Sequence, residues 1–589
     1  MPDLTPAPAT SPESVADEPF ADEPFAGVTV VDEPFASVTV ADKTVADEPL
    51  GDTAAGFSPP QWFSDRQRWA WPLGFALAGV VLFFVYLRIA ERHGFGADGA
   101  VLEQMAWDML HGNPLMRGWT FADISFYTIE IPELAVVEWL HGGISPGVLS
   151  AVEALNLTVL VLLVAFLAKG RATGREGLVR AVVAGGILFA PVAGENSTLM
   201  LSNPDHLATQ IFVLAAWLIV DRARPRWWVP VAVAAVLAWA RMSDSIVLLE
   251  AELPLLVVCA VRIYRRGGAL RDQWYDLSLG GAAIAAELIA QLALRTIRAL
   301  GGFNAYPLQE AFAPVSQLTT HIGVTMESSL LLYGADFSGL PLKGNLTLLT
   351  AAVHMIGVAL AVTAVVYALR KFPGNDLMPQ IVTMMLVTSV LAYTLLSRGG
   401  SAVGGAHDVW PVLPAGAVLA GRLPFKSPIP RRLLAVVAAG LALYLVLLAV
   451  YTVQVMDNPN QRPLATWLVD HHLRFGLSNY YAGALITVDG DNRTTIAPVK
   501  RKGDDLVLSP WESTTSWYNP ALNDATFFVA TPLLGCPPGD AARWVTAAIR
   551  AFGQPNHRYS VDGEKVLVWN HNLLDTSLPQ VPMGRPSAC

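Results

Sequence analysis

Long apolar stretches separated by short polar loops dominate the chain from Trp69 to about residue 455. A helix of about 20 apolar residues is long enough to cross the hydrocarbon core of a bilayer. The pattern therefore predicts about eleven transmembrane helices, several of them short. The expected spans are residues 69–90, 148–168, 181–194, 207–220, 229–240, 246–261, 277–294, 346–369, 377–396, 409–421 and 433–453.

Two parts of the chain lack this pattern. Residues 1–66 repeat a unit of about ten residues built on Asp-Glu-Pro-Phe, whose proline and charge predict a disordered acidic tail. Residues 456–589 are less apolar and predict a small α/β domain. Within it we expect strands at 480–491, 493–510, 523–531 and 565–570, and a helix at 538–553.

The expected fold class is therefore an all-α polytopic membrane bundle, at residues 67–455, with a small C-terminal α/β domain and a disordered N-terminal tail. The composition agrees, because hydrophobic residues make up 53% of the chain and charged residues only 15%. The net charge of −10 belongs to the tail, where twelve acidic residues in residues 1–60 face a single lysine. Nothing in the remainder suggests a basic face that binds nucleic acid.

Arginine-rich loops follow every second expected span and also flank the first span. Such loops stay on the cytoplasmic side of a membrane. This rule predicts a cytoplasmic N-terminus, a first extracytoplasmic loop at 91–146 and an extracytoplasmic C-terminal domain. We expect the bacterial plasma membrane as the location. Cys536 and Cys589 then lie on the oxidising side, where a disulfide and an unpaired Cys589 both remain open.

The sequence contains no phosphate-binding P-loop, dinucleotide-binding glycine motif, paired-cysteine motif or His-Glu-x-x-His motif. These absences disfavour an ATP-driven pump, and we expect neither a cofactor nor a metal site. Few ionisable residues lie inside the expected spans. Arg241 and Asp244 are three positions apart and are expected to pair on one helix face. His354 is expected to be a hydrogen-bonded core histidine.

The first extracytoplasmic loop carries an unusual number of acidic side chains between aromatic ones. Carboxylates at the rim of a bilayer are costly unless they stay hydrated, are paired or serve a function. A solvated amphipathic loop without chemistry explains the same composition, so both interpretations stay open here. The carboxylates are Asp98, Glu103, Asp108, Asp123, Glu130, Glu133 and Glu138.

Three segments resemble the multi-pass C-type (GT-C) glycosyltransferases. Residues 95–119 place an acidic residue, Asp98, directly after the first span, followed by a helix and a Gly-x-Pro turn, as in that superfamily. Residues 121–143 are similar to a Phe-Asp-x-His-Pro-Pro-Leu region of the protein O-mannosyltransferase branch, with looser spacing. Residues 401–423 resemble a late Arg-Tyr-x-x-Pro-x-x-Pro segment, with His407 and Asp408 replacing Arg-Tyr.

This resemblance implies an inverting transfer of a sugar from a polyprenyl-phosphate donor in the membrane to a glycan, lipid or protein acceptor outside the cytoplasm. The acceptor hydroxyl needs a general base, for which Asp98 is the first candidate and Asp123 the second. The leaving phosphate needs positive charge or a metal ion to take up its developing charge. The substrate-binding candidates are His111, Arg117, Asp205, Arg398, His407 and Asp408.

Two other functions remain open. A transporter or flippase of lipid-linked substrates predicts an intramembrane polar pathway and internal repeats, and no convincing repeat is present among the spans. A catalytically inactive membrane anchor that presents the C-terminal domain predicts that Asp98 and Asp123 tolerate substitution. The departures from the family motifs at Gly99 and at residues 131–133 favour the anchor.

Overall fold

The structure is a computed structural model, and it describes residues 61–189, 199–202, 206–307, 311–338, 346–396, 405–424, 431–453, 461–531 and 539–580. Several predictions fall outside these ranges. They concern the acidic tail, Asp205, Arg398 and the Cys536–Cys589 disulfide. Cys259 is a free, buried cysteine.

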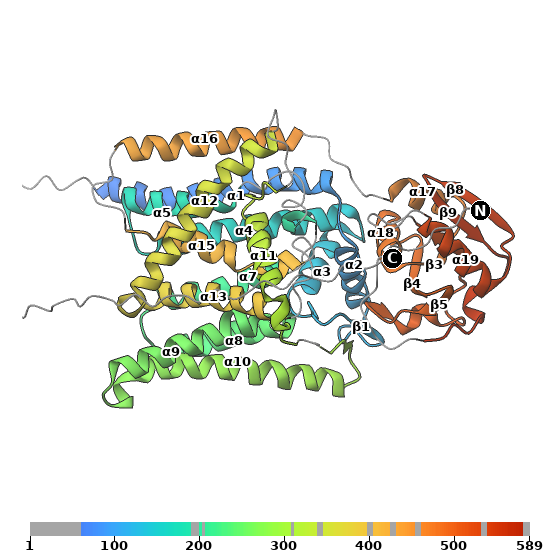
Figure 1. Cartoon of the computed structure of the whole chain (residues 1–589), viewed down its shortest axis with the longest axis horizontal. Helices are drawn as coiled ribbons and strands as arrows, with labels where there is room; N and C mark the ends of the chain where they lie inside the picture. Colours follow the sequence, from blue (N-terminus) through green and yellow to red (C-terminus); the bar gives the residue numbers. More distant parts are fainter. Residues whose placement is uncertain are drawn as a thin grey trace, which may run out of the picture. The chain divides into compact units, whose positions relative to one another are not determined.

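All eleven apolar stretches contain helix (Figure 1). Five of these helices, α1, α4, α10, α12 and α13, are long and apolar enough to cross a membrane. The chain is therefore an integral membrane protein. The number of eleven spans stays a prediction. The helices are α1 (Gln61–His93), α4 (Pro146–Lys169), α5 (Gly174–Leu188), α7 (Leu207–Arg222), α8 (Trp228–Ser243), α9 (Leu253–Arg266), α10 (Trp274–Ala299), α12 (Leu346–Arg370), α13 (Leu377–Leu395), α15 (Val412–Gly421) and α16 (Arg431–Val453).

Two local features depart from the expected pattern. Helix α11 (Leu318–Leu332) occupies the stretch that was expected to be a long loop between the seventh and eighth spans. One turn of π-helix, η1 (Leu248–Glu252), precedes α9 within the sixth apolar stretch. Single π-helical turns inside α-helices occur frequently at functional sites.

Basic side chains link the helix ends at one end of the bundle. Arg222 donates hydrogen bonds to the carbonyl oxygens of Gly170 and Phe166 at the end of α4. Arg422, just after α15, forms an ion pair with Asp221 at 2.7 Å. These contacts bring together three loops that the positive-inside rule assigns to one side of the membrane.

Two short helices, α2 (Ala97–Leu110) and α3 (Glu130–His141), stand at the other end of the bundle, between the long helices and the C-terminal domain (Figure 1). Helix α3 has an unusual distribution of polarity, because Glu130 and Glu138 are fully buried while Trp139 and Leu140 are 72% and 70% exposed. An exposed apolar face beside membrane helices is typical of a helix that lies in the bilayer interface.

The C-terminal part contains a six-stranded mixed sheet in the order β5-β4-β3-β7-β9-β8. The central strands β4, β3 and β7 are parallel, and the outer pairings are antiparallel. Helix α19 (Asp540–Phe552) packs on the sheet and ends before Gly553, as expected. The strands are β3 (Phe475–Ser478), β4 (Thr495–Lys502), β5 (Asp505–Leu508), β7 (Phe527–Ala530), β8 (His557–Val561) and β9 (Glu564–Val568).

The strand expected at residues 480–491 is wrong. Residues Tyr480–Asp489 form helix α18, which Asn479 caps by accepting a hydrogen bond from the amide of Ala482. The helix is buried between α2 and strand β4, so nearly all its positions are apolar. A short apolar run of this kind cannot be told from a buried strand by periodicity. Helix α17 (Arg462–Asp470) precedes it.

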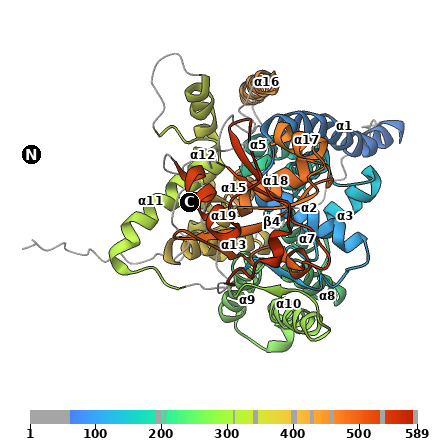
Figure 2. The same cartoon turned by 90° about the vertical axis from the view of Figure 1, so that its right-hand side faces the viewer.

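A small second sheet joins three distant parts of the chain. Strand β1 (Trp119–Phe121) of the first loop pairs in parallel with β2 (Asn304–Ala305), which follows α10, and antiparallel with β6 (Ser513–Thr514) of the C-terminal part. Figure 2 looks onto the C-terminal elements from the right-hand side of Figure 1, with α2 beside α18. The sheet therefore fixes the first loop between the bundle and the C-terminal domain.

Candidate functional site

The loop after β1 is attached to the end of α8 by hydrogen bonds. The hydroxyl of Ser125 donates to the carbonyl oxygen of Met242 at 2.7 Å, and the amide of Phe126 donates to that of Ser243 at 2.8 Å. Asp123, the second candidate base, is half-buried two residues before this attachment. Its position is therefore fixed relative to the bundle.

The end of α8 also contacts His206, which lies next to the predicted but undescribed Asp205. His206 precedes α7 with a left-handed backbone, φ 62°, and its ring is 1% exposed. Its Nδ1 lies 2.5 Å from Oδ2 of the fully buried Asp244. The expected pairing of Arg241 with Asp244 is therefore wrong, because Arg241 instead binds Glu287 on α10 at 2.7 Å.

The predicted residues His407 and Asp408, about 200 positions later in the sequence, lie close to His206. They lie in a short helical turn, η5 (Ala406–Val409), before α15. The rings of His407 and His206 stack nearly in parallel, 5.4 Å apart. The metal-binding atoms of His206, His407 and Asp408 all lie within 4.8 Å of one another.

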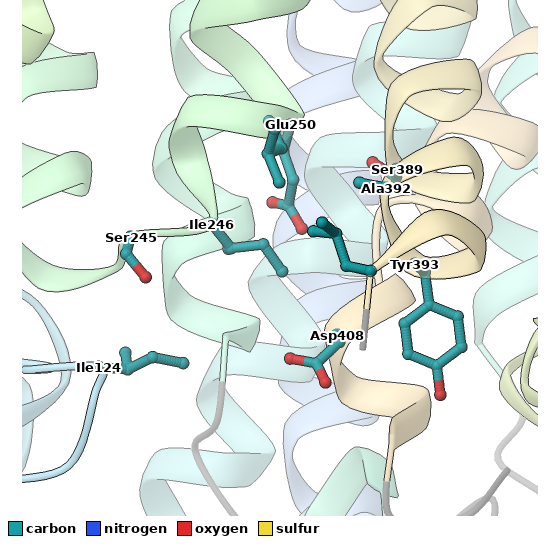
Figure 3. A pocket seen from close by; sticks show the side chains of 10 residues that line it. Ile124, Ser245, Ile246, Glu250, Ser389, Ala392, Tyr393 and Asp408 are labelled. Atoms are coloured by element: carbon teal, nitrogen blue, oxygen red, sulfur yellow. The ribbon is translucent and has the colours of Figure 1, made fainter. Parts of the chain in front are cut away.

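Asp408 also lines a cavity of about 70 Å³, large enough for a few water molecules (Figure 3). Ile124, the neighbour of Asp123, lines the same cavity, and so does Glu250 from the π-helical turn η1. Among the described lining residues there is no lysine or arginine. The lining is Ile124, Ser245, Ile246, Leu249, Glu250, Ser389, Ala392, Tyr393, Leu396 and Asp408.

Besides Asp244, a second buried carboxylate, that of Glu130 on α3, is bonded to the end of α8. Glu130 accepts hydrogen bonds from the hydroxyls of Ser243 at 2.6 Å and Thr209 at 2.9 Å. Burial raises the pKa of Glu130 to about 8, against the opposing effect of these hydroxyls, and the nearby charge of Asp244 adds to the rise. Glu130 therefore connects α3, α7 and α8 close to the histidines.

Asp98, the first candidate base, lies at the start of α2 and is half-buried. It accepts a hydrogen bond at 2.5 Å from the hydroxyl of Tyr480, which also contacts Glu512, so both partners belong to the C-terminal part. Two residues earlier, the amide of Gly96 donates to the carbonyl oxygen of Ser202 at 2.9 Å. Asp98 thus stands near the loop that leads to His206.

The other predicted substrate-binding residues are placed differently. His111 is exposed at the far end of α2, where its ring packs on Trp107 and its Nδ1 contacts the Trp107 carbonyl oxygen at 2.7 Å. The side chain of Arg117 is exposed in the turn before β1. Asp205 and Arg398 lie outside the described residues.

Sequence reasoning missed four side chains of this site: His206, Asp244, Glu250 and Tyr393. His206 and Asp244 lie in loops beside apolar stretches, and a histidine next to the selected Asp205 was an available signal. Glu250 and Tyr393 lie inside expected spans, where only their polarity marks them. His354, in contrast, is buried with its Nδ1 2.7 Å from the Tyr333 carbonyl oxygen, which confirms it as a hydrogen-bonded core histidine.

No family model matches the sequence, and no curated protein sequence does. The oligosaccharyltransferase AglB from Archaeoglobus fulgidus, solved with an inhibitory peptide and a dolichol-phosphate, aligns with 80% of this chain and 70% of its own at 12% identity and a TM-score of 0.44. The same enzyme with Zn and sulfate aligns over 82% and 72% at 13% identity, with a TM-score of 0.44.

ArnT from Cupriavidus metallidurans, solved with undecaprenyl phosphate bound, aligns with 87% of this chain and 99% of its own at 12% identity and a TM-score of 0.52. At this identity the likeness concerns the fold alone. The mannosyltransferase branch expected from the sequence stays a prediction. The chain therefore shares the overall fold of ArnT.

Proposed function

We propose that this protein is a membrane glycosyltransferase that moves a sugar from a polyprenyl-phosphate donor to an acceptor at the end of the bundle that carries α2 and α3. The observation that carries this proposal is a cavity lined by Asp408 and by Ile124 of the Asp123 loop, with the ligand atoms of His206 and His407 within 4.8 Å of that of Asp408. These groups come from loops far apart in the sequence. A fold that only anchored the C-terminal domain would not need to gather them.

Two features support a lipid-linked donor. Helix α3 has an exposed apolar face with Trp139 and Leu140, which is typical of a helix that lies in the bilayer interface. It stands at the same end of the bundle as the cavity. ArnT, which has the same fold, is a protein solved with undecaprenyl phosphate bound. A donor of this kind keeps its chain in the bilayer, so its phosphate reaches a site only at the rim.

The proposed chemistry is an inverting displacement at the anomeric carbon of the sugar. A carboxylate of the chain, Asp123 or Asp98, takes the proton of the acceptor hydroxyl as its oxygen forms the new bond to the anomeric carbon. The bond from that carbon to the phosphate oxygen breaks on the opposite face, and polyprenyl phosphate leaves with the electron pair. Proton, sugar and leaving group are then all accounted for without a redox step.

The test is sugar transfer in membranes that contain the protein, with radiolabelled polyprenyl-phosphate sugars as donors. Wild type is compared with Asp123→Asn, Asp98→Asn and Asp408→Asn at equal expression. A general base contributes about 100- to 10,000-fold, so substitution of the base should lower transfer by about 100-fold or more. Asp470→Asn, at the exposed last position of α17, is the matched control and should leave transfer unchanged.

The variants also separate the remaining candidates. Loss in Asp98→Asn alone identifies Asp98 as the base, and loss in Asp123→Asn alone identifies Asp123. If the wild type transfers no sugar from any donor, the proposal is wrong. Movement of labelled lipid across proteoliposomes would then support the transporter, and its absence would support the anchor.

A further inference from the structure

His206, His407 and Asp408 have the arrangement of a metal-binding site. Their ligand atoms lie within 4.8 Å of one another. Ligand atoms bound to Zn²⁺ at about 2.0–2.2 Å stand roughly 3–4 Å apart, so movements of about 1 Å bring the three atoms to binding distance. Two histidines and a carboxylate are a common ligand set for first-row divalent metals.

The surroundings orient the ligands as metal sites require. A metal-binding histidine commonly donates its other ring N–H to a carboxylate, which fixes the ring and increases its basicity. Asp244 fills this role for His206, with Nδ1 to Oδ2 at 2.5 Å. Asp244 is itself held, because its Oδ1 accepts a hydrogen bond from the amide of Ile246 at 2.9 Å. With Nδ1 donating to Asp244, Nε2 carries the lone pair that binds a metal.

The site opens onto a space for a further ligand. Asp408 lines the cavity that also contains Glu250 and Tyr393 (Figure 3). A metal bound by only three protein groups keeps coordination positions for water or substrate oxygen. A structural site would instead close around the ion with four protein ligands. The local geometry therefore fits an ion that a substrate contacts.

We propose that His206, His407 and Asp408 bind one divalent transition-metal ion such as Zn²⁺, with Asp244 as the positioning residue of His206. The ion would face the cavity and accept an oxygen of an anionic substrate. Its role as the group that receives the donor phosphate rests on the proposed glycosyltransferase function. Binding of the ion itself does not depend on that function.

The charge of the cavity lining favours an ion with a role at phosphate. The described lining of the cavity contains two carboxylates, of Glu250 and Asp408, and no lysine or arginine. A leaving phosphate needs positive charge to stabilise it. A divalent ion between the carboxylates and the phosphate supplies that charge and acts as a Lewis acid.

The test measures metal binding on the full chain purified in detergent and stripped with a chelator. Zn²⁺ is titrated with elemental analysis of the retained metal, and Co²⁺ is titrated with its visible d–d absorption as a report of coordination. We expect His206→Ala and His407→Ala each to retain one equivalent less of Zn²⁺ than wild type and to lose the Co²⁺ band. The side chain of His407 is 26% exposed and that of His206 is 1% exposed, so His407→Ala disturbs the packing less than His206→Ala.

Two further variants sharpen the result. Asp244→Asn removes the orienting carboxylate and should lower Zn²⁺ affinity about 10- to 100-fold while the stoichiometry stays the same. His471→Ala, at an exposed position after α17, is the histidine control and should bind as the wild type does. Equal retention by wild type and His407→Ala, or an equal loss in His471→Ala, would show adventitious binding only and overturn the proposal.

The metal proposal and the proposed function fail in different ways. Metal binding that depends on His206 and His407, in a protein that transfers no sugar, would keep the site and reject the glycosyltransferase. Sugar transfer that persists after metal removal, with no site-dependent Zn²⁺ binding, would keep the enzyme and reject the metal.

Discussion

Two residues at the candidate site adopt a backbone conformation that L-amino acids seldom take. His206 and Phe126 have φ values of 62° and 51°, and their rings meet edge to face at 5.9 Å. Left-handed backbone at a non-glycine residue costs about 1–3 kcal/mol and persists only where the surroundings impose it. Here the bond from His206 to Asp244 and the amide bond from Phe126 to Ser243 impose it. The same contacts hold the histidine beside the loop of Asp123.

Glu138 gives a prediction at the scale of a single carboxyl group. It is fully buried on α3, and neither of its oxygens has a hydrogen-bond partner among the described residues. Burial and the nearby charge of Glu103 raise its pKa from 4.5 to about 10. Between these values the folded chain keeps a proton that the unfolded chain releases, so stability falls as the pH rises.

We therefore expect Glu138→Gln to be more thermostable than wild type at pH 8, by about 2 °C or more, with the advantage shrinking toward pH 5. The glutamine keeps the shape of the side chain and removes the cost of holding a proton. Thermal unfolding in detergent at several pH values measures this. The exposed Glu327→Gln is the control, and a gain that is the same at pH 5 and pH 8 would contradict the argument.

At the residue scale, the sequence could identify chemistry but not contacts. His407 and Asp408 were selected from their loop; Asp408 lines the cavity, and His407 lies close to Asp408 and His206. The partner of Asp244 could not be predicted, because the spacing to Arg241 suggested a pair on one helix whereas the structure pairs each residue with another helix or loop. Side-chain partners depend on which elements meet, and helical spacing does not contain that information.

At the scale of elements, α15 packs closely against α4 and α5. A Cβ atom added at Gly421 would lie 2.6 Å from the carbonyl oxygen of Arg180 and 2.8 Å from the Cβ of Ala168. Backbone atoms of a neighbouring helix cannot move aside as a flexible side chain can. Glycine at this position therefore lets three helices approach closely.

Gly421→Ala should lower the thermal stability of the protein. Alanine gains about 1 kcal/mol of helix propensity, but overpacking against backbone costs about 1–3 kcal/mol, so we expect a net loss. Thermal unfolding in detergent, with Gly281→Ala as control, measures the difference. Gly281 on α10 has open space around its Cβ position, so its substitution should be neutral or stabilising. An equal effect of both substitutions would rule out the packing explanation.

Helices were predicted correctly where the apolar stretch was long or where a residue such as glycine marked the end of the helix. Every apolar stretch became helix, and α19 ends before Gly553 as its sequence indicated. It failed at α18, where burial on two sides removed the polar face that distinguishes a helix from a strand. It also missed α11, whose mixed composition resembled a loop, and the two-residue strands of the small sheet, which have no local signal.

At the scale of the whole molecule, the C-terminal part is built into the candidate site region rather than attached to it by one linker. Strand β6 pairs with β1 of the first loop, α18 packs on α2, and Tyr480 reaches Asp98. Burial raises the pKa of the Tyr480 hydroxyl well above its ordinary value, so this group stays a donor between the two carboxylates of Asp98 and Glu512. Movement of the domain would therefore be transmitted to Asp98.

Tyr480→Phe tests this connection. Loss of the hydroxyl removes the hydrogen bond that half-buried Asp98 accepts, and a carboxylate that loses such a donor costs about 1–3 kcal/mol. We expect lower thermal stability and faster hydrogen exchange in the first turn of α2. Tyr559→Phe, on the partly exposed strand β8, should change neither.

A double-mutant cycle then distinguishes the two possible roles of Asp98. If Asp98 only docks the C-terminal domain, Asp98→Asn and Tyr480→Phe remove the same interaction, and their effects on stability and on sugar transfer are both strongly non-additive. If Asp98 is also the base, its substitution abolishes transfer even where Tyr480→Phe lowers stability without removing activity. Coupling in stability, together with transfer lost only in Asp98→Asn, would therefore show that one carboxylate both holds the domain and serves the reaction. Additive effects on stability would instead mean that the hydrogen bond contributes nothing to docking, and the connection between domain and site would have to run through the small sheet.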